Sequence, residues 1–398
     1  MELKNKTVIL GISGSIAAYK MANVASTLAK AKCDVHTIMT QNATEIITPL
    51  TFSTLTGHNT IVDTFDKTVN YNVAHVALAK RADALLIAPA TANIIAKLAY
   101  GLADDMLTTT ALACTCPKIV APAMNTAMYN NPIVQKNIRI LRDAGFIIIE
   151  PDSGILACKD EGAGKLPAED VLLDYLYREI ACPKDLLGQK ILITAGPTCE
   201  SLDPVRYITN HSSGKMGYAL ARCAMLRGAS VTLISGPTQL PKVPFTTHIA
   251  VESAQDMYDA VMAQGPSHGI IIKSAAVADY TPLVCADDKI KKKEGDLSLA
   301  LKRTPDILGA LGEKRLPHQF LCGFSMETQD LVKNSQDKLI RKNVDMVIAN
   351  NLKVAGAGFS GDTNVVTIIT KDSVSELGLM SKEDTAYHIL DEILRHKK

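Results

Sequence analysis

The chain has 398 residues, of which 47% are hydrophobic and 21% are charged, a size and composition typical of two soluble α/β domains. Its formal net charge of +1 gives no field that would favour a nucleic acid or an anionic membrane, and it contains no apolar run long enough to span a bilayer. The nine cysteines form no CxxC pair and no signal-peptide core is evident, so we expect a reduced, cytoplasmic chain.

Strands and helices alternate through the first half. We expect a strand at 7–12, a Ser-Gly-Ser turn, and a helix to about Lys30, because apolar residues then recur at helical spacing. This alternation predicts a parallel sheet covered by helices on both faces. Further short apolar strands are predicted at 35–39, 84–88, 118–122 and 146–150.

The pattern restarts after a boundary near 181–185. A strand at 190–194 precedes a turn and a polar insertion, and a helix then runs to Arg227. The fold class is therefore α/β with two Rossmann-like three-layer domains, 1–182 and 188–398, with ligands at the carboxyl ends of the strands. More strands are predicted at 231–235, 270–273, 320–324, 345–349 and 365–370.

Three separated polar side chains in the first half suggest an active site. His75, Asn125 and Cys158 each stand beside a predicted strand end or loop, and they supply a base, an amide and a thiol. Each also has an ordinary structural explanation. These are a histidine on a helix face, an Asx turn after a proline, and a cysteine packed as a small hydrophobe.

Two strand-to-helix loops in the first half could hold a phosphate. In the segment 11–15, small residues let backbone amides approach an anion at a helix N-terminus, but the segment is not G-x-G-x-x-G, which disfavours NAD(P). In the second loop, 88–93, Thr91 or Asn93 could simply cap the next helix.

Several motifs together resemble a known family. The segments 14–20, 89–93, 101–105, 122–129 and 156–158 resemble the flavin-dependent cysteine decarboxylases. With the second half included, nearly all of the chain resembles the bacterial bifunctional phosphopantothenoylcysteine decarboxylase/phosphopantothenate–cysteine ligases of coenzyme A biosynthesis.

For the first half the resemblance implies FMN and a decarboxylation to 4′-phosphopantetheine without net redox change. It makes His75 the base or orienting group, Asn125 the ligand of the substrate carboxylate and Cys158 the proton donor. It also makes 160–167 a substrate-covering flap, although Lys159 replaces the glycine usual after this cysteine and Tyr129 stands where tryptophan is common. The implied flavin contacts are Gly14, Ser15, Thr40, Pro89, Ala90, Thr91 and Asn93.

The second half contains no G-x-x-x-x-G-K-[ST] motif, which argues against a P-loop ATPase. A polar, Gly/Ser-rich loop at 203–217 leads into a helix and could hold a phosphorylated ligand. The lysine-rich segment 288–293 has an ordinary explanation, because most such segments are solvated loops.

For this half the resemblance implies that 4′-phosphopantothenate reacts with CTP to form an acyl-cytidylate, from which cysteine displaces CMP. Asn210 would hold this intermediate, Lys289 would reach the phosphates from a mobile loop, and Asp279 is the plausible protein ligand of Mg²⁺. The implied CTP contacts are Lys273, Ser274, Ala275, Asp279, Lys289, Pro305, Asp306, Ile307, Leu308, Phe324, Lys338 and Lys342.

The resemblance also implies a homo-oligomer with trimeric flavin domains and dimeric ligase domains, which a dodecamer would satisfy. Three other hypotheses remain open. They are a decarboxylase whose degenerate second half only dimerises, an NAD(P) oxidoreductase with two Rossmann domains, and a related flavoprotein prenyltransferase. The last would explain neither Cys158 nor the second half.

Overall fold

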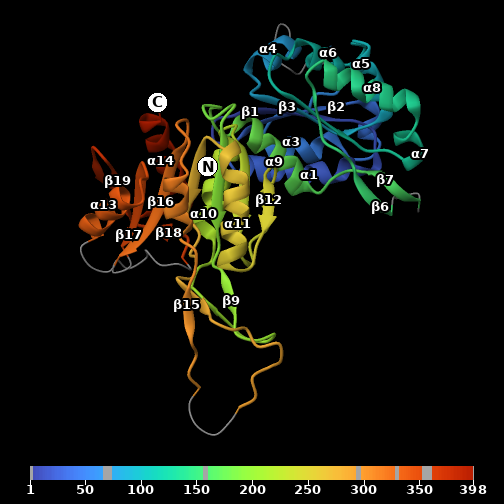
Figure 1. The fold of residues 1–398 in the computed structure, drawn as a ribbon. Helices are drawn as coiled ribbons and strands as arrows, with labels where there is room; N and C mark the ends of the chain where they lie inside the picture. Colours follow the sequence, from blue (N-terminus) through green and yellow to red (C-terminus); the bar gives the residue numbers. More distant parts are fainter. Residues whose placement is uncertain are drawn as a thin grey trace. The chain divides into compact units, whose positions relative to one another are not determined.

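The structure is a computed structural model that describes residues 3–65, 74–155, 160–292, 297–327, 331–351 and 361–397. The chain divides into two units, Met1–Cys182 and Pro183–Lys398 (Figure 1), and each is described by itself.

The first unit is built on a parallel five-stranded sheet with the order β2-β1-β3-β4-β5. Each predicted strand is present, although the last shrinks to two residues. The direction of the strand order reverses between β1 and β3, which is the position where open α/β sheets bind ligands. The strands are β1 (Thr7–Ile12), β2 (Asp34–Met39), β3 (Ala84–Ala90), β4 (Lys118–Pro122) and β5 (Ile147–Ile148).

Strand alternation gives this sheet two buried faces. Leu10 and Leu86 belong to a core cluster with residues of α1 and α9, whereas Ile9 and Ile87 belong to a second cluster with residues of α5, α6 and α8. The predicted first helix begins as a 3-10 turn, η1 (Ile16–Lys20), and continues as α1 (Met21–Lys30). The other helices are α2 (Gln41–Thr44), α3 (Pro49–Thr56), α4 (Ala74–Arg81), α5 (Ala92–Ala99), α6 (Met106–Ala113), α7 (Thr126–Tyr129), α8 (Pro132–Asp143) and α9 (Glu169–Ile180).

The second unit contains an eight-stranded sheet with the order β12-β11-β8-β13-β16-β17-β19-β20. Its first six strands are parallel and follow the Rossmann order 3-2-1-4-5-6, with the switch point between β8 and β13. The last two strands run antiparallel. The strands are β8 (Lys190–Ala195), β11 (Ser230–Ser235), β12 (Thr247–Ala250), β13 (Ile270–Lys273), β16 (Phe320–Glu327), β17 (Met346–Asn351), β19 (Val366–Thr370) and β20 (Val374–Glu376).

Helices cover both faces of this sheet. One face packs residues of α11, α12 and α13 against Leu192, Ile271 and Leu321, while α10 and α14 pack together and α10 lies on β8 and β11. The helices are α10 (Lys215–Leu226), α11 (Ala254–Gln264), the 3-10 turn η2 (Gly265–Ser267), α12 (Ile307–Glu313), α13 (Leu331–Arg341) and α14 (Lys382–His396).

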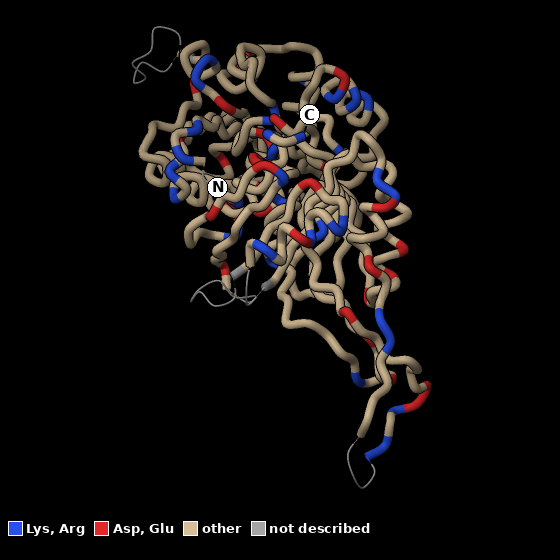
Figure 2. The backbone as a smooth tube through the Cα atoms, turned by 60° about the vertical axis from the view of Figure 1, so that its left-hand side comes forward, with Lys and Arg blue, Asp and Glu red and all other residues tan. Residues whose placement is uncertain are grey.

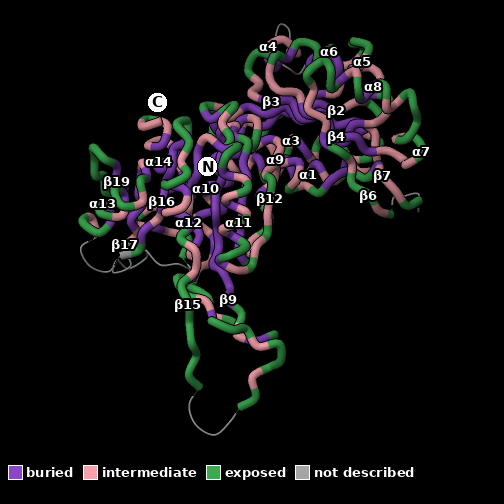
Figure 3. Tube along the Cα trace, viewed as in Figure 1, coloured by how far each residue is buried: buried purple, intermediate pink, exposed green. Residues whose placement is uncertain are grey.

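Short antiparallel strand pairs project from both units. Those near β9 and β15 form an arm of the second unit that is largely exposed, in contrast to the buried sheet strands (Figure 3). These pairs were not predicted, because their strands are short and mostly polar. The pairs are β6 (Asp152–Ile155) with β7 (Glu161–Lys165), β9 (Cys199–Ser201) with β10 (Tyr207–Thr209), β14 (Tyr280–Pro282) with β15 (Leu301–Arg303), and β18 (Thr363–Asn364) with β21 (Met380–Ser381).

No helix of the described part of the chain is both long enough and apolar enough to cross a bilayer. Lysine and arginine positions are interspersed with aspartate and glutamate positions along the described backbone (Figure 2), in agreement with the net charge of +1.

Candidate active sites

At the switch point of the first sheet, hydrogen bonds join the loop after β1 to the loop at the end of β3. Ser13, directly after β1, donates from Oγ to the carbonyl oxygen of Pro89 over 2.7 Å, and the backbone N–H of Thr91 donates to Ser13 Oγ over 2.9 Å. The predicted loops at 11–15 and 88–93 therefore meet at the carboxyl edge of β1 and β3. Thr91 also caps α5, as the structural alternative anticipated, and Asn93 is exposed.

Two further predicted flavin contacts lie beside this switch point. A Cβ on Gly14 would stand 2.6 Å from Cβ of Asn42, so the turn after β1 packs closely on α2. Thr40 precedes α2, and its buried Oγ1 has no hydrogen-bond partner among the described residues. A close-packed glycine turn beside an unpaired buried hydroxyl is compatible with a phosphorylated cofactor that would bring its own acceptors.

A cavity of about 440 Å³ opens at the same edge, and we call it the Asn125 cavity. It brings together two predicted site residues, Ser15 and Asn125, which are far apart in the sequence. Tyr19, Lys20 and Lys165 also line it; they belong to the motif 14–20 and the flap 160–167 but were not predicted individually as site residues. The remaining lining residues are Ile16, Ala17, Ala123, Met124, Ile155, Gly164 and Leu166.

Asn125 makes two kinds of contact. Its Oδ1 accepts from the backbone N–H of Ala127 over 2.8 Å and caps α7, so the Asx-turn alternative is present. Its Nδ2 donates to Oδ2 of Asp160 over 2.6 Å. The amide that was predicted to hold a substrate carboxylate therefore already holds a carboxylate from this chain.

Asp160 arrives on the hairpin of β6 and β7, the segment predicted as a flap. The hairpin is attached to the loop after β4, because the N–H of Met124 donates to the carbonyl of Gly164 over 3.0 Å. Gly164 has φ 136°, and a Cβ there would lie 2.3 Å from the Met124 oxygen, so only glycine allows this approach. Cys158 and Lys159 lie outside the described residues, between the two strands.

His75 stands in the first turn of α4, half-buried, and does not line the Asn125 cavity. The other end of α4 is tied to the amino end of β2, because Arg81 donates from NH2 to Asp34 over 2.8 Å. The first turn therefore points toward the opposite edge of the sheet, where the strands end. Within one chain the structure does not bring His75 to Asn125.

In the second unit two adjoining cavities lie at the carboxyl ends of β13 and β16. The Asn210 cavity, about 430 Å³, and the Asp306 cavity, about 420 Å³, share Lys273, Asp279 and Lys338 in their walls. All predicted CTP contacts except Lys289 line one or both of them. Those in the Asn210 cavity are Lys273, Ser274, Ala275, Asp279, Phe324 and Lys338, and those in the Asp306 cavity include Pro305, Asp306, Ile307, Leu308 and Lys342.

Positive charge is concentrated in these walls. Burial, and after it the charge of the neighbouring Lys338, lower the pKa of Lys273 to about 8. Lys338 follows the predicted helix face, donating to the carbonyl of Phe324 over 2.9 Å, whereas Lys342 lies just after α13 and pairs with Asp306. Burial opposes ionisation of Asp306, but the hydrogen bond from Lys342 holds its pKa below the usual value. Excess cations favour an anionic ligand.

The polar loop after β10 is fixed onto the end of β13. Asn210 donates from Nδ2 to the carbonyls of Ala276 and Val277 over 3.1 and 3.2 Å. This places the following Ser212–Lys215 segment in the wall of the Asn210 cavity. Cationic wall residues that were not predicted come from distant segments, where each looks like a surface residue; they are Arg303, Arg341 and Lys382.

Lys289 is exposed on the arm and lines neither cavity. The segment beside it is anchored, because the N–H of Ile290 donates to Oδ2 of Asp203 over 3.1 Å and Arg206 donates to the Ile290 carbonyl over 2.8 Å. The Arg206 guanidinium also holds the pKa of Asp203 well below its usual value, so this carboxylate stays ionised.

The first unit has the strand order of flavodoxin-like proteins, and the second has a Rossmann sheet with a cation-lined pair of cavities, so the chain is a two-domain α/β protein of the class that binds nucleotides and nucleotide cofactors. Residues 1–181 match the family model described as Flavoprotein. Residues 186–396 match the DNA/pantothenate metabolism flavoprotein C-terminal domain.

Two curated relatives are similar along their whole length. The coenzyme A biosynthesis bifunctional protein CoaBC of Bacillus subtilis is 47% identical over 395 residues, covering 98% of this chain and 97% of its own. That of Escherichia coli K12 is 40% identical over 397 residues, covering 99% and 98%. A crystal structure of the C-terminal domain of a CoaBC protein is 45% identical, covers 53% of this chain and 98% of its own, and has a TM-score of 0.46. The chain belongs to the family of bifunctional coenzyme A biosynthesis proteins CoaBC, which confirms the family predicted from its motifs.

Proposed function

We propose that this chain catalyses two consecutive steps of coenzyme A biosynthesis. The second unit joins 4′-phosphopantothenate to cysteine in a reaction driven by CTP, and the first unit decarboxylates the product to 4′-phosphopantetheine. The observation that carries the proposal is the convergence of eleven of the twelve predicted CTP contacts on two adjoining cation-lined cavities. Two cation-lined cavities are expected in a domain that binds phosphorylated substrates. A degenerate second half that only dimerises would not need them.

In the ligase reaction the lysines of the shared wall offset the charge of the phosphates. Lys273, Lys338 and Lys342 lie around the Asp306 cavity, which the first residues of α12 also line. The substrate carboxylate attacks the α-phosphorus of CTP and pyrophosphate leaves. The amine of cysteine then attacks the acyl carbon and CMP leaves with the electron pair of the broken C–O bond. Asn210 keeps the polar loop in position for the acyl-cytidylate.

Magnesium would be held largely by phosphates and water. Asp279 borders both cavities, whereas the Asp306 carboxylate is already occupied by Lys342 and by the N–H of Gly309. Among the described residues, no group of three metal-ligating side chains surrounds Asp279. One carboxylate with substrate phosphates is the usual arrangement for this ion.

Lys289 would stabilise charge that develops during nucleotidyl transfer. Because it stands on the arm and outside both cavities, the arm must move, or the lysine must serve the site of a second chain. The second route agrees with the dimer expected from the family resemblance. A flexible ammonium that reaches the phosphates only as charge develops stabilises the transition state more than it stabilises the bound substrates.

The first unit fits FMN. The close-packed turn at Gly14, the unpaired Oγ1 of Thr40 and the joined loops at Ser13 and Thr91 surround the switch point where flavodoxin-like sheets bind this cofactor. When bound, FMN supplies a two-electron acceptor and donor, so that the substrate thiol is oxidised before carbon dioxide leaves and reduced again afterwards.

The chain's own side chains would orient the substrate and move its protons. Asn125 holds the departing carboxylate through a neutral amide, which avoids the strong ion pair that would oppose decarboxylation. Cys158 would donate the proton that the enethiolate takes up as it is reduced to the product, and His75 would act as the base or orienting group. Because His75 does not line the Asn125 cavity, we propose that a neighbouring chain contributes it, as in a trimer of flavin domains.

We also propose that the protein works in the cytoplasm. None of the eight cysteines that the structure describes is in a disulfide, which supports a reducing compartment.

Mass detection of products tests the whole proposal. The purified full-length protein is given 4′-phosphopantothenate, cysteine, CTP and magnesium, and its visible spectrum is recorded. We expect 4′-phosphopantetheine, CMP and pyrophosphate from a yellow protein. Phosphopantothenoylcysteine without phosphopantetheine would contradict the first-unit assignment alone, and absence of CMP would contradict the second. His75→Asn should abolish decarboxylation and leave ligation unchanged, which separates the two sites.

A further inference from the structure

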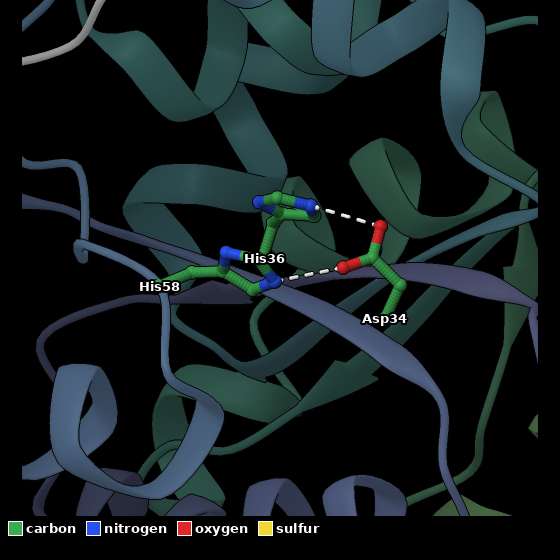
Figure 4. Close-up of side chains that lie close together, drawn as sticks. All are labelled: Asp34, His36 and His58. Carbon is green, nitrogen blue, oxygen red and sulfur yellow. Dashed lines mark hydrogen bonds and ion pairs between the residues drawn. The ribbon is translucent and has the colours of Figure 1, made fainter.

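Three metal-ligating side chains meet at the amino end of β2, outside both candidate active sites. Asp34 Oδ1 lies 2.8 Å from Nε2 of His58, and Asp34 Oδ2 lies 3.2 Å from Nε2 of His36 (Figure 4). The ligand atoms of the three residues all lie within 4.8 Å of one another. We call these residues the Asp34 cluster. It is the one such group of three found among the described residues.

Local structure fixes the position of each side chain. Asp34 and His36 are two residues apart on one strand, so they project from the same face of the sheet. His58 follows Gly57, which ends α3 with φ 75° and turns the chain back toward β2. The returning segment is hydrogen-bonded to the strand, because Ile61 N–H donates to the Thr37 carbonyl over 3.0 Å. The ligands are therefore held by backbone contacts and not only by one another.

The two imidazoles present their Nε2 atoms to the same carboxylate. The rings of His36 and His58 are stacked, with centroids 4.3 Å apart and planes inclined by 22°. The His36 side chain is 9% exposed and that of His58 is 42% exposed, so one ligand is anchored in the core while the other faces solvent. Water can therefore reach the cluster from one side.

We propose that Asp34, His36 and His58 bind a divalent transition-metal cation of the zinc type, with water as the fourth ligand. Two imidazole nitrogens and one carboxylate oxygen are ligands that Zn²⁺ accepts at about 2.0–2.2 Å, which in a tetrahedron separates ligand atoms by about 3.3 Å. His36 Nε2 lies 3.2 Å from Asp34 Oδ2, close to that value, whereas His58 Nε2 lies 2.8 Å from the other carboxylate oxygen, Oδ1, and all the ligand atoms lie within 4.8 Å of one another. A small rotation of the half-exposed His58 completes the site.

The cation would replace the two histidine–carboxylate hydrogen bonds and compete with Arg81 for Asp34, whose Oδ2 also accepts from Thr7 Oγ1 over 3.3 Å. Arg81 donates from NH2 to Asp34 Oδ2 over 2.8 Å, and its half-exposed side chain can turn into solvent. Cys33 is adjacent in sequence but its thiol bonds to the carbonyl oxygen of Lys6, so it is not a fourth ligand. The site would tie β2 to the chain after α3 at the edge of the sheet opposite the Asn125 cavity. Its role is therefore structural, and the inference does not depend on the proposed function.

Titration calorimetry of the chelator-treated full-length protein with ZnCl₂ tests the site. We expect one Zn²⁺ that His58→Gln weakens at least about 10-fold, because a ligand is lost. The matched variant His318→Gln, which alters an exposed histidine of the second unit, should bind like the wild type. Equal zinc uptake and affinity in the wild type and His58→Gln would overturn the proposal, as would absence of binding to the folded wild type.

A second variant and a second readout guard against simple misfolding. Arg81→Met removes the competing cation and should tighten zinc binding, while weaker binding in this variant would contradict the geometry. At free zinc about 100 times Kd, the midpoint of thermal unfolding of the first unit should rise by about 5–10 °C in the wild type. The same zinc should leave His58→Gln unchanged, and an equal rise in both proteins would count against the site.

Discussion

The side-chain amide of Asn125 donates a 2.6 Å hydrogen bond to the carboxylate of Asp160, which reaches it from the hairpin of β6 and β7. In the proposed reaction the same amide binds the carboxylate that leaves as carbon dioxide. Asp160 therefore stands where a substrate group is expected, and the two carboxylates compete for one donor.

Removal of Asp160 should relieve that competition. Asp160→Ala should lower KM for phosphopantothenoylcysteine by about 3-fold to 10-fold, the net effect of one solvent-exposed hydrogen bond. Steady-state decarboxylation kinetics measure it, with Asp152→Ala as the control, because Asp152 is an exposed carboxylate on the same hairpin. A higher KM in Asp160→Ala would mean that Asp160 helps to bind the substrate.

The hairpin itself depends on Gly164. Gly164→Ala should destabilise the first unit by about 1–3 kcal/mol more than Gly154→Ala, as measured by chemical unfolding. Both glycines have positive φ, 136° and 150°, but only a Cβ at Gly164 meets backbone, whereas nothing lies within 4 Å at Gly154. Equal losses of stability would show that the hairpin is not held by its contact with Met124.

Binding of CTP should depend on the protonation of Lys273. Its pKa is lowered to about 8, so the ammonium is lost as the pH rises through that value, and CTP affinity should then fall by up to about 10-fold per pH unit. Calorimetry at pH 8 in buffers of different ionisation enthalpy should show proton uptake on binding. Lys273→Met should bind CTP more weakly, with neither the uptake nor this pH dependence. The same shift affects the free energy of unfolding. Between pH 8 and 10.5 Lys273 is protonated in the unfolded chain and largely neutral in the folded chain, so this group makes the folded state more stable as the pH rises across that window.

The arm lysines provide a matched pair. Lys289→Gln should slow CMP formation about 100-fold with little change in CTP affinity, because the ammonium is needed only as charge develops. Lys291→Gln alters a neighbouring exposed lysine and should retain the wild-type rate. Rapid-quench measurement of acyl-cytidylate formation distinguishes the two, and equal rates for both variants would exclude Lys289 from the reaction.

A buried arginine holds part of the second unit together. Arg227 is 1% exposed and pairs with Asp185 and Asp391 over 2.6 and 2.8 Å while its guanidinium stacks on Tyr387. Arg227→Met should lower the free energy of unfolding by about 1–2 kcal/mol, because the chain loses two charge-assisted hydrogen bonds while the partly exposed carboxylates of Asp185 and Asp391 regain water.

Arg222→Met, on the same helix, is the control and should cost less than about 1 kcal/mol. The Arg227 hydrogen bond holds the pKa of Asp185 below its usual 3.8, so its contribution is present above that pH and is lost as pH falls through the lowered value. Urea unfolding between pH 3 and 7 should show this loss in the wild type and a smaller one in Arg227→Met.

Much of the fold could be predicted because buried parallel strands read as short apolar runs between turns. This holds for the segments that became β1, β8 and β13, each found at the predicted position. The direction of a strand leaves no such pattern, and β19 turned out to run antiparallel to β17. A polar pair of two-residue strands, such as β18 with β21, also leaves no pattern in the sequence, because its register depends on contacts with distant segments.

The chemistry divides in the same way. The sequence alone determined the kinds of side chain available, the two-domain organisation and the loops in which Asn125, Asn210 and Asp279 stand, because these depend on local pattern and motif. Only the tertiary structure decided that Asp160 meets Asn125, that Lys289 stays outside the cavities and that His58 reaches Asp34. Each of these is a contact, or an absent contact, set by how strands and loops stack in space, and the residues that meet carry no mark of one another in their own neighbourhoods.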